Sequence, residues 1–248
     1  MMSEFKNKKI FITGASKGIG FALAEYLDGC GASLLLHASS DEGVKRLNEE
    51  FLSDAHKFWQ ADFFNPEAFE LKLTGILDDF GPLDGFVNCV GVRMRRPINL
   101  LNVGVIQQTM TANFVSYMEL VKIISKRNRF NSGLSIISIS SISAHAGGAA
   151  VSVYAASKGA IESANRCLAK ELYKKNIRVN SIICGQVGTE AYNDLMASRE
   201  NATDPVLERQ YMGLGIPKDV VNIITFVLSE NSQFINGQSI PADGGYLT

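Results

Sequence analysis

Short apolar runs alternate with longer amphipathic stretches along this chain of 248 residues, and this alternation limits the fold more than any other feature of the sequence. Runs rich in Ile, Val, Leu and Phe predict buried strands at 8–14, 32–38, 84–91, 134–140 and 177–183, with a less apolar strand at 56–62. Helical patterns occupy 18–29, 41–53, 66–80, 101–129, 152–176 and 217–230. Strands that are apolar on both faces and alternate with helices indicate a parallel sheet covered on both sides. Because parallel crossovers are right-handed, we expect an α/β fold with a doubly wound parallel sheet of about seven strands.

The chain has no internal repeat, low-complexity linker or charge block, so we interpret residues 1–248 as a single domain. Its least regular stretch is 186–216, which is polar and mixed and precedes the last helix. Ligands of doubly wound sheets bind beyond the carboxyl ends of the strands, so this stretch is a candidate substrate lid. A pair of surface helices without a function is the alternative interpretation.

Composition narrows the range of partners. The formal net charge of −1 gives no sign of a nucleic-acid-binding surface. The four cysteines are widely spaced with no C-x-x-C pair, which favours reduced thiols over disulfides or a metal site. The N-terminus "MMSEFKNKK" lacks the apolar core of a signal peptide, and no apolar run approaches the ~18 residues of a membrane helix. We therefore expect a cytoplasmic protein without a bound metal or a membrane contact.

A glycine-rich turn, "TGASKGIG" at 13–20, follows the first predicted strand and opens the first helix. Glycines let the backbone turn tightly and approach a ligand, and the free N–H groups of a helix N-terminus suit a pyrophosphate. Strand, glycine turn and helix at the start of such a series predict the dinucleotide site of a Rossmann fold. The residues expected to form it are Gly14, Ser16, Lys17, Gly18, Ile19 and Gly20.

The same turn also matches a hydrolase motif. "GASKG" at 14–18 fits G-x-S-x-G, the nucleophile elbow, with Ser16 as its serine. That elbow would fall on the first strand, with no earlier strand to supply an oxyanion-hole loop. Its histidine partner would be His37, His56 or His145, none of which has a recognisable setting. The dinucleotide interpretation is therefore preferred.

Several motifs occur together in one order. They are TGxxxGxG at 13–20, Asn88-x-x-Gly91 after the fourth strand, Tyr154-x-x-x-Lys158, "RVNSIICGQVGT" at 178–189 and "INGQSIPADGG" at 235–245. In this order the chain resembles the short-chain dehydrogenase/reductases over essentially its whole length. Ser141, thirteen residues before Tyr154, and Asn113 in the long middle helix fit that family's catalytic pattern. By resemblance, Asn88, Gly91, Val187 and Thr189 contribute to the cofactor side.

The chemistry of these residues agrees with the resemblance. Tyr154 and Lys158 are four residues apart, so they share one helix face. A tyrosine has a pKa near 10, and a nearby ammonium is expected to pull that pKa toward neutrality. Tyr154 then exchanges a proton with a carbonyl oxygen that Ser141 orients by a hydrogen bond. The resemblance further implies that Lys158 holds the nicotinamide ribose and that Asn113 anchors a water in a proton relay to Lys158.

Two motifs depart from the family's pattern. The usual Asn-Asn-Ala-Gly is "NCVG" at 88–91, which predicts altered packing rather than lost activity. The usual Pro-Gly after the sixth strand is Cys184-Gly185, and the missing proline is expected to loosen the loop at the nicotinamide.

The end of the second strand bears on which nicotinamide is used. NAD-preferring members carry an acid there for the ribose hydroxyls, whereas this chain has His37, Ala38 and Ser39. Asp41 and Glu42 follow too late and are expected to begin a helix capped by Ser40. Lys17 stands where NADP-preferring relatives carry a cation for the 2′-phosphate. The absent carboxylate and the present cation both favour NADP(H), and Asp62 is expected to contact the adenine.

Three functions remain open from the sequence. The leading one is NADPH-dependent reduction of a ketone, closest in look to β-ketoacyl-acyl-carrier-protein reductases. Basic residues at two helix ends are candidate docking points for an acidic carrier protein or mere helix caps: Lys126, Arg127, Arg129, Lys174 and Lys175. The second is reduction of a small polar or sugar-like ketone, and the third is a catalytically idle NADP sensor.

Three further expectations concern the cleft and the assembly. Arg93, Arg95 and Arg96 are expected near the cleft mouth, facing a substrate anion or solvent. His145 is expected to line the rim without acting. By resemblance, we expect a homotetramer built through the helices at 101–129 and 152–176 and the C-terminal end.

Overall fold

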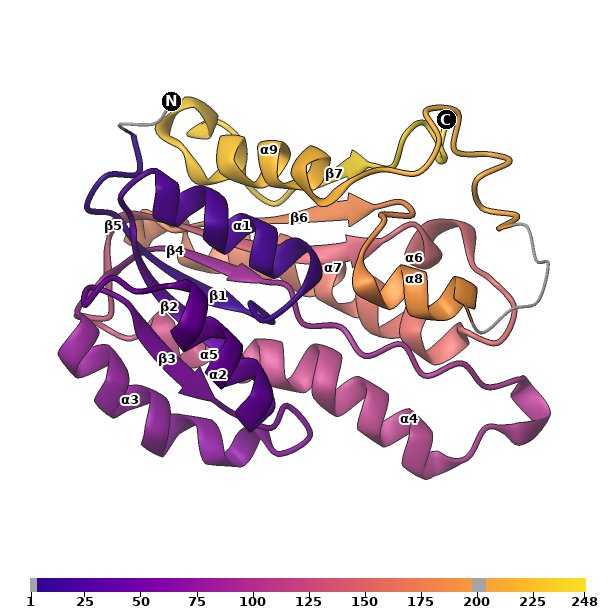
Figure 1. Cartoon of the computed structure of the whole chain (residues 1–248), viewed down its shortest axis with the longest axis horizontal. Helices are drawn as coiled ribbons and strands as arrows, with labels where there is room; N and C mark the ends of the chain where they lie inside the picture. Colours follow the sequence, from indigo (N-terminus) through magenta and orange to yellow (C-terminus); the bar gives the residue numbers. More distant parts are fainter. Residues whose placement is uncertain (1–3, 198–203) are drawn as a thin grey trace.

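The computed structural model describes residues 4–197 and 204–248 of the chain. Its seven strands form one parallel sheet in the order β3-β2-β1-β4-β5-β6-β7 (Figure 1). The strands are β1 (Lys9–Thr13), β2 (Ser33–Ala38), β3 (Lys57–Gln60), β4 (Leu83–Asn88), β5 (Phe130–Ser141), β6 (Arg178–Cys184) and β7 (Ser239–Ala242). The chain starts in the middle of the sheet, runs to one edge and returns to build the other half. The doubly wound α/β fold expected from the sequence is confirmed.

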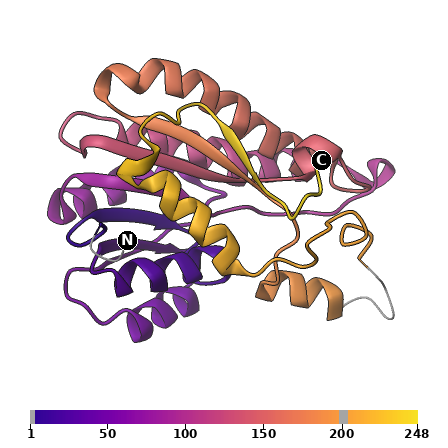
Figure 2. The same ribbon diagram turned by 90° about the horizontal axis from the view of Figure 1, so that it is seen from above.

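Helices cover both faces of this sheet (Figures 1 and 2). One layer contains α1 (Gly18–Gly29), α2 (Asp41–Glu50) and α9 (Pro217–Leu228). The other contains α3 (Phe69–Phe80), α4 (Val103–Met110), α5 (Ser116–Ile124) and α7 (Ser152–Leu172). Two shorter helices, α6 (Ser143–Ala146) and α8 (Glu190–Ala197), follow β5 and β6.

Alternate side chains of the central strands enter different cores, because successive residues of a strand point to opposite faces. Ile10 and Ile12 of β1 pack in the α1/α9 layer, whereas Phe11 between them stacks on Phe86 of β4 in the other layer, with ring centroids 5.0 Å apart. Each fully buried apolar side chain of this size contributes roughly 1.5–3 kcal/mol of transfer free energy. The apolar side chains of the strands are therefore buried in the two cores. Residues that bind or react are expected at the ends of the strands.

Local polar signals set several helix boundaries. Ser40 caps α2 as predicted, its hydroxyl accepting from the Gly43 N–H at 3.1 Å. The expected helix at 101–129 is interrupted: a π-helical turn at Thr111–Val115 separates α4 from α5. Such turns insert one extra residue and are frequent at functional sites, and this one carries Asn113. In the described residues, no helix combines the length and apolar character needed to cross a membrane.

Candidate functional site

A cavity of about 530 Å³ opens at the carboxyl ends of β1, β2 and β4. This is the edge where parallel sheets bind ligands, since the strands diverge there. The cavity brings together most of the predicted cofactor residues, namely Gly14, Ser16, Lys17, Gly18, Ile19, Gly20, His37, Ser39, Asp62, Gly91, Tyr154, Lys158 and Thr189. These come from segments 175 residues apart, between Gly14 and Thr189, so the grouping is a product of the tertiary fold.

The glycine turn has the geometry of a phosphate cradle. A Cβ on Gly20 would lie 2.3 Å from the Gly14 carbonyl oxygen, so no other residue fits there. Gly14 and Gly18 adopt φ of +66° and +60°, a backbone region that favours glycine. The turn brings the N-terminus of α1 to the cavity, where the Gly18 N–H donates to the Glu190 carboxylate at 3.0 Å, and a helix N-terminus in this position suits a dinucleotide pyrophosphate.

His37 lies at the cavity but has no free nitrogen to offer a ligand. Its Nδ1 accepts from the Gly14 N–H at 3.1 Å, and its Nε2 donates to the Ala61 carbonyl at 3.0 Å. Burial lowers the pKa of His37 to about 4, so the ring stays neutral. The cofactor-binding role of His37 stays a prediction: the residue lines the cavity, and its ring holds the glycine turn against β2 through Gly14.

Two predicted asparagines are also structural supports. Asn88 is buried and does not line the cavity; its Oδ1 accepts from the Thr13 hydroxyl at 2.6 Å and joins β4 to β1. Asn113 grips the loop after β4, accepting from the Val92 N–H at 2.7 Å and donating to the Val92 carbonyl at 3.0 Å. It also donates to the Ser157 hydroxyl at 2.9 Å, beside Lys158 on α7.

Ser141, Tyr154 and Lys158 meet where the first cavity joins a second one of about 400 Å³. Ser141 ends β5, while Tyr154 and Lys158 lie in the first turns of α7, and Tyr154 lines both cavities. The Ser141 hydroxyl acts on the Tyr154 hydroxyl as a donor that favours the phenolate and lowers the Tyr154 pKa. The Lys158 ammonium lies 5.9 Å from the Tyr154 ring centroid and donates to the Ile139 carbonyl at 2.7 Å and the Val90 carbonyl at 3.3 Å.

Burial has the largest effect on the pKa values of Tyr154 and Lys158. It raises the pKa of Tyr154, and the Ser141 hydrogen bond and the Arg93 charge oppose that rise only in part. Burial also lowers the pKa of Lys158 to about 8. The expectation that the ammonium pulls the Tyr154 pKa below its ordinary value is therefore wrong, because desolvation of the phenolate is the larger effect. The Tyr154 side chain is a neutral phenol.

Gly91 shapes the space for Lys158. A Cβ at Gly91 would lie 2.8 Å from the Lys158 Nζ and 3.2 Å from its Cε. The glycine of "NCVG" is thus required by a side chain that approaches from another element. The neighbouring Cys89 is half-buried and lines the cavity, and desolvation raises the pKa of its thiol to about 12, so the thiol keeps its proton.

The second cavity shares Tyr154 with the first. Of the three arginines expected near the cleft mouth, Arg93 and Arg95 line it, together with Ser141, Gln186 and Val187, whereas Arg96 does not. The Arg93 guanidinium lies 5.7 Å from the Tyr154 ring centroid, on the cavity wall. A positively charged wall beside the hydroxyl pair suits a polar or anionic substituent on a carbonyl compound.

The loop after β6, which lacks the usual proline, is hydrogen-bonded to a distant glutamine. Gln210 is buried, accepts from the Gln186 N–H at 2.8 Å and donates to the Gln186 carbonyl at 3.0 Å. The Gln186 side chain donates to Asp204 at 2.6 Å. A glutamine 24 residues further along the chain thus bonds to this loop, and the loosening expected from the missing proline stays a prediction. Gln210 lies in no recognisable sequence motif, so its contact with Gln186 is evident only from the fold.

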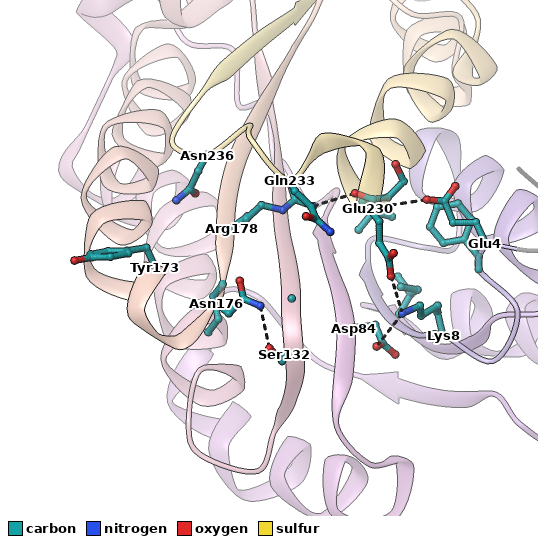
Figure 3. Close-up of a pocket in the computed structure, with 16 residues that line it drawn as sticks. Glu4, Lys8, Asp84, Ser132, Tyr173, Asn176, Arg178, Glu230, Gln233 and Asn236 are labelled. Carbon is teal, nitrogen blue, oxygen red and sulfur yellow. Dashed lines mark hydrogen bonds and ion pairs between the residues drawn. The ribbon is translucent and has the colours of Figure 1, made fainter.

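Another cavity, of about 390 Å³, lies at the opposite end of the sheet (Figure 3). Its charges are mutually satisfied: Lys8 pairs with Asp84 and Glu230, and Arg178 donates to the Val227 and Ser229 carbonyls. No glycine turn or strand carboxyl end faces it. The dinucleotide geometry is found only at the site described above, among the cavities of the described residues.

Known proteins match this chain from end to end. A family model described as enoyl-(acyl carrier protein) reductase matches residues 14–247. The solved short-chain dehydrogenase/reductase (glucose/ribitol dehydrogenase) of Brucella melitensis superposes with a TM-score of 0.90 at 27% identity and covers 100% of both chains. The chain belongs to the short-chain dehydrogenase/reductase family.

Relatives in this short-chain dehydrogenase/reductase family act on different compounds. The 3-oxoacyl-[acyl-carrier-protein] reductase of Vibrio cholerae is 28% identical over 98% of both chains. The L-rhamnose 1-dehydrogenase (NADP(+)) of Thermoplasma acidophilum is 30% identical over 99% of this chain and 98% of its own. The protein is thus an oxidoreductase of the class that interconverts alcohols and carbonyl compounds.

Proposed function

We propose that the protein reduces a ketone to a secondary alcohol with NADPH, and that Tyr154 is the proton donor. The observation that carries this proposal is the position of Tyr154, which lines both the dinucleotide cavity and the substrate cavity. The Ser141 hydroxyl beside it supplies a second hydrogen bond for the same carbonyl oxygen.

The residues divide the work as follows. NADPH, when bound, supplies the hydride. The neutral Tyr154 hydroxyl donates its proton to the substrate oxygen, and Ser141 orients that oxygen. The Lys158 ammonium, fixed by two backbone carbonyls, stabilises the phenolate that Tyr154 becomes. Asn113 positions Lys158 indirectly through Ser157 and the loop at Val92.

The preference for NADPH over NADH is supported by charge. Ser39 and Lys17 line the cavity at the end of β2 and in the glycine turn, where a 2′-phosphate would lie. Buried His37 brings no negative charge to repel that phosphate, and Asp62 at the same cavity is available to the adenine side. The cation at Lys17 and the lack of an acid among residues 37–39 at the end of β2 favour the phosphorylated nucleotide.

The substrate is best described as a ketone with a polar or anionic substituent. Arg93 and Arg95 on the substrate wall support this class, whether it is a small sugar-like ketone or an acyl thioester. Docking of an acidic carrier protein has weaker support, because Lys126 and Arg129 already pair with Glu70 and Asp78.

Three organisational features complete the proposal. We treat residues 1–248 as a single catalytic domain, and 186–216 as a lid of which residues 198–203 lie outside the described part. The helices at 103–124 and 152–172, with the C-terminal end, form the interfaces of a homotetramer; exposed Ile106, Val115 and Phe234 suit such contacts. Light scattering on the purified protein measures the assembly.

Turnover with a panel of carbonyl compounds tests the function. The panel contains sugar-like ketones, a 3-oxoacyl thioester and an enoyl thioester, each with NADPH and with NADH. We expect NADPH oxidation with one of the ketones. NADPH binding without turnover of any compound would instead support the alternative of a catalytically idle NADP sensor. Reduction of the enoyl thioester alone would contradict the proposed reduction of a ketone and indicate reduction of a carbon–carbon double bond.

A further inference from the structure

A carboxylate is buried on the same face of α7 as the catalytic pair. Tyr154, Lys158 and Glu162 follow one another at intervals of four residues, so they form one stripe along the helix. The Glu162 residue is only 3% exposed. An acid at such a depth is costly unless its charge is compensated, which raises the question of what this one does.

Both oxygens of Glu162 are held by neighbouring elements. The Ser140 hydroxyl, next to catalytic Ser141 on β5, donates to Oε1. His145 Nε2 on α6 lies 2.9 Å from Oε2 and 3.2 Å from Oε1. His145 therefore does not line the cleft rim as the sequence suggested; its half-exposed ring connects the buried carboxylate to solvent. The three residues form a fixed cluster behind the active-site strand.

Adjacent residues of β5 connect this cluster to Lys158. The Lys158 ammonium donates to the Ile139 carbonyl at 2.7 Å, and the next residue, Ser140, donates to Glu162. Three groups act on Lys158 electrostatically, the Cys184 and Cys89 thiols and Glu162. Burial raises the pKa of each thiol to about 12, so both remain neutral at the pH of a working enzyme.

The other elements packed against this part of α7 bring no further acid. The strand β5 and the helix α4 have no titratable side chain, and α6 contributes only His145. The strand β6 contributes Cys184 and Arg178 at opposite ends, and the Arg93 guanidinium lies 5.7 Å from the Tyr154 ring centroid. Among the described residues that face Lys158, Glu162 is therefore the carboxylate.

We propose that Glu162 is a positioning residue of the active site: held by Ser140 and His145, its carboxylate keeps Lys158 in the ammonium form. The inference rests on the proposed reductase function, in which the ammonium stabilises the Tyr154 phenolate. Removal of the carboxylate takes away a negative charge that favours the ammonium, while the desolvation that disfavours it remains. The pKa of Lys158 then falls, and the side chain loses its proton at lower pH.

Titration of Lys158 by NMR tests the inference without any turnover. The protein carries ¹³C-labelled lysine, and a Lys158→Met variant assigns the signal. In Glu162→Gln, which preserves shape, the Lys158 midpoint is expected to fall by roughly 0.5–1 pH unit, below the 1–3 units of a directly contacting pair. Glu171→Gln, which removes an exposed acid from the same helix, is the matched control and leaves the midpoint unchanged.

Two further measurements separate the possible outcomes. His145→Ala, at a half-exposed position, removes one partner of Glu162 and is expected to shift the midpoint in the same direction by less; it also serves if Glu162→Gln does not fold. The alkaline limb of the kcat profile for ketone reduction must move with the NMR midpoint. An unmoved midpoint, an unmoved alkaline limb, or an equal shift in Glu171→Gln overturns the inference. Absence of turnover at every pH defeats the proposed function but leaves the NMR result interpretable.

Discussion

Gly91 offers a sharp test of how Lys158 is placed. In Gly91→Ala the new methyl group would lie 2.8 Å from the Lys158 Nζ, well inside ordinary van der Waals contact. The φ of Gly91 is not in the left-handed region, so the backbone accepts alanine without strain. The collision therefore falls on Lys158, which has little room to retreat because it is 2% exposed.

The size of the effect follows from the contacts that Lys158 would lose. Its ammonium must move by about half an ångström or more, which weakens the 2.7 Å bond to Ile139 or the 3.3 Å bond to Val90. A hydrogen bond from a charged group contributes about 1.5–3 kcal/mol. If the transition state carries that loss, kcat/KM for ketone reduction falls by roughly 10- to 100-fold.

Steady-state NADPH oxidation measures this loss, and Gly159→Ala is the matched control. Gly159 is the next residue after Lys158, a Cβ there meets nothing within 4 Å, and alanine in a helix is favoured over glycine by roughly 0.5–1 kcal/mol. The control is expected to keep full activity with equal or higher thermal stability. Full activity in Gly91→Ala would refute the assignment of Lys158 as the group that the glycine accommodates.

Three further predictions concern the proton donor, the nucleotide and the glycine turn. Tyr154→Phe is expected to lower kcat by about 10²- to 10⁴-fold while NADPH binding, followed by fluorescence, is retained; unchanged kcat would exclude Tyr154 as the donor. Lys17→Glu is expected to raise KM for NADPH about tenfold or more and to leave KM for NADH nearly unchanged, whereas an equal rise for both would remove the 2′-phosphate role. Because the pKa of buried His37 is about 4 and that of an unfolded histidine about 6.5, the unfolded chain binds the extra proton between these values. Stability contributed by neutral His37 is thus complete above pH 6.5 and declines by about 3 kcal/mol as pH falls to 4; urea titrations of His37→Gln should show a shallower decline, and an identical slope would contradict it.

Local patterns predicted much of the fold. The apolar runs, with the less apolar run at 56–62, located six of the seven strands, whereas β7 (Ser239–Ala242) was not predicted as a strand; the parallel arrangement followed from strand–helix alternation. Boundaries were less accurate where tertiary packing overrides the pattern. The strand β5 begins at Phe130 rather than 134, since its first residues still pair with Leu83 of β4. The helix at 101–129 contains a π turn that no residue preference marks.

The site was predicted where chemistry depends on spacing and missed where it depends on contacts from afar. Tyr154 and Lys158 share a face because four residues make about one helical turn. The sequence did not show that His37 bonds to the glycine turn and to the segment between β3 and α3, because both partners are distant in the sequence. Gln210 and Glu162 were missed, since neither lies in a motif and each acts on a segment distant in sequence.

The sequence by itself determined the parallel sheet, the glycine turn and the Tyr154/Lys158 pair. These depend on the period of the apolar residues, the backbone freedom of glycine and the pitch of a helix, each of which acts within a few residues. Only the tertiary structure decided how those parts ionise and stay in place. Burial keeps the Tyr154 pKa high, Gly91 leaves room for the Lys158 ammonium, and Gln210 bonds to the loop after β6. Desolvation and contact between remote segments have no local signature, so they exist only once the chain has folded.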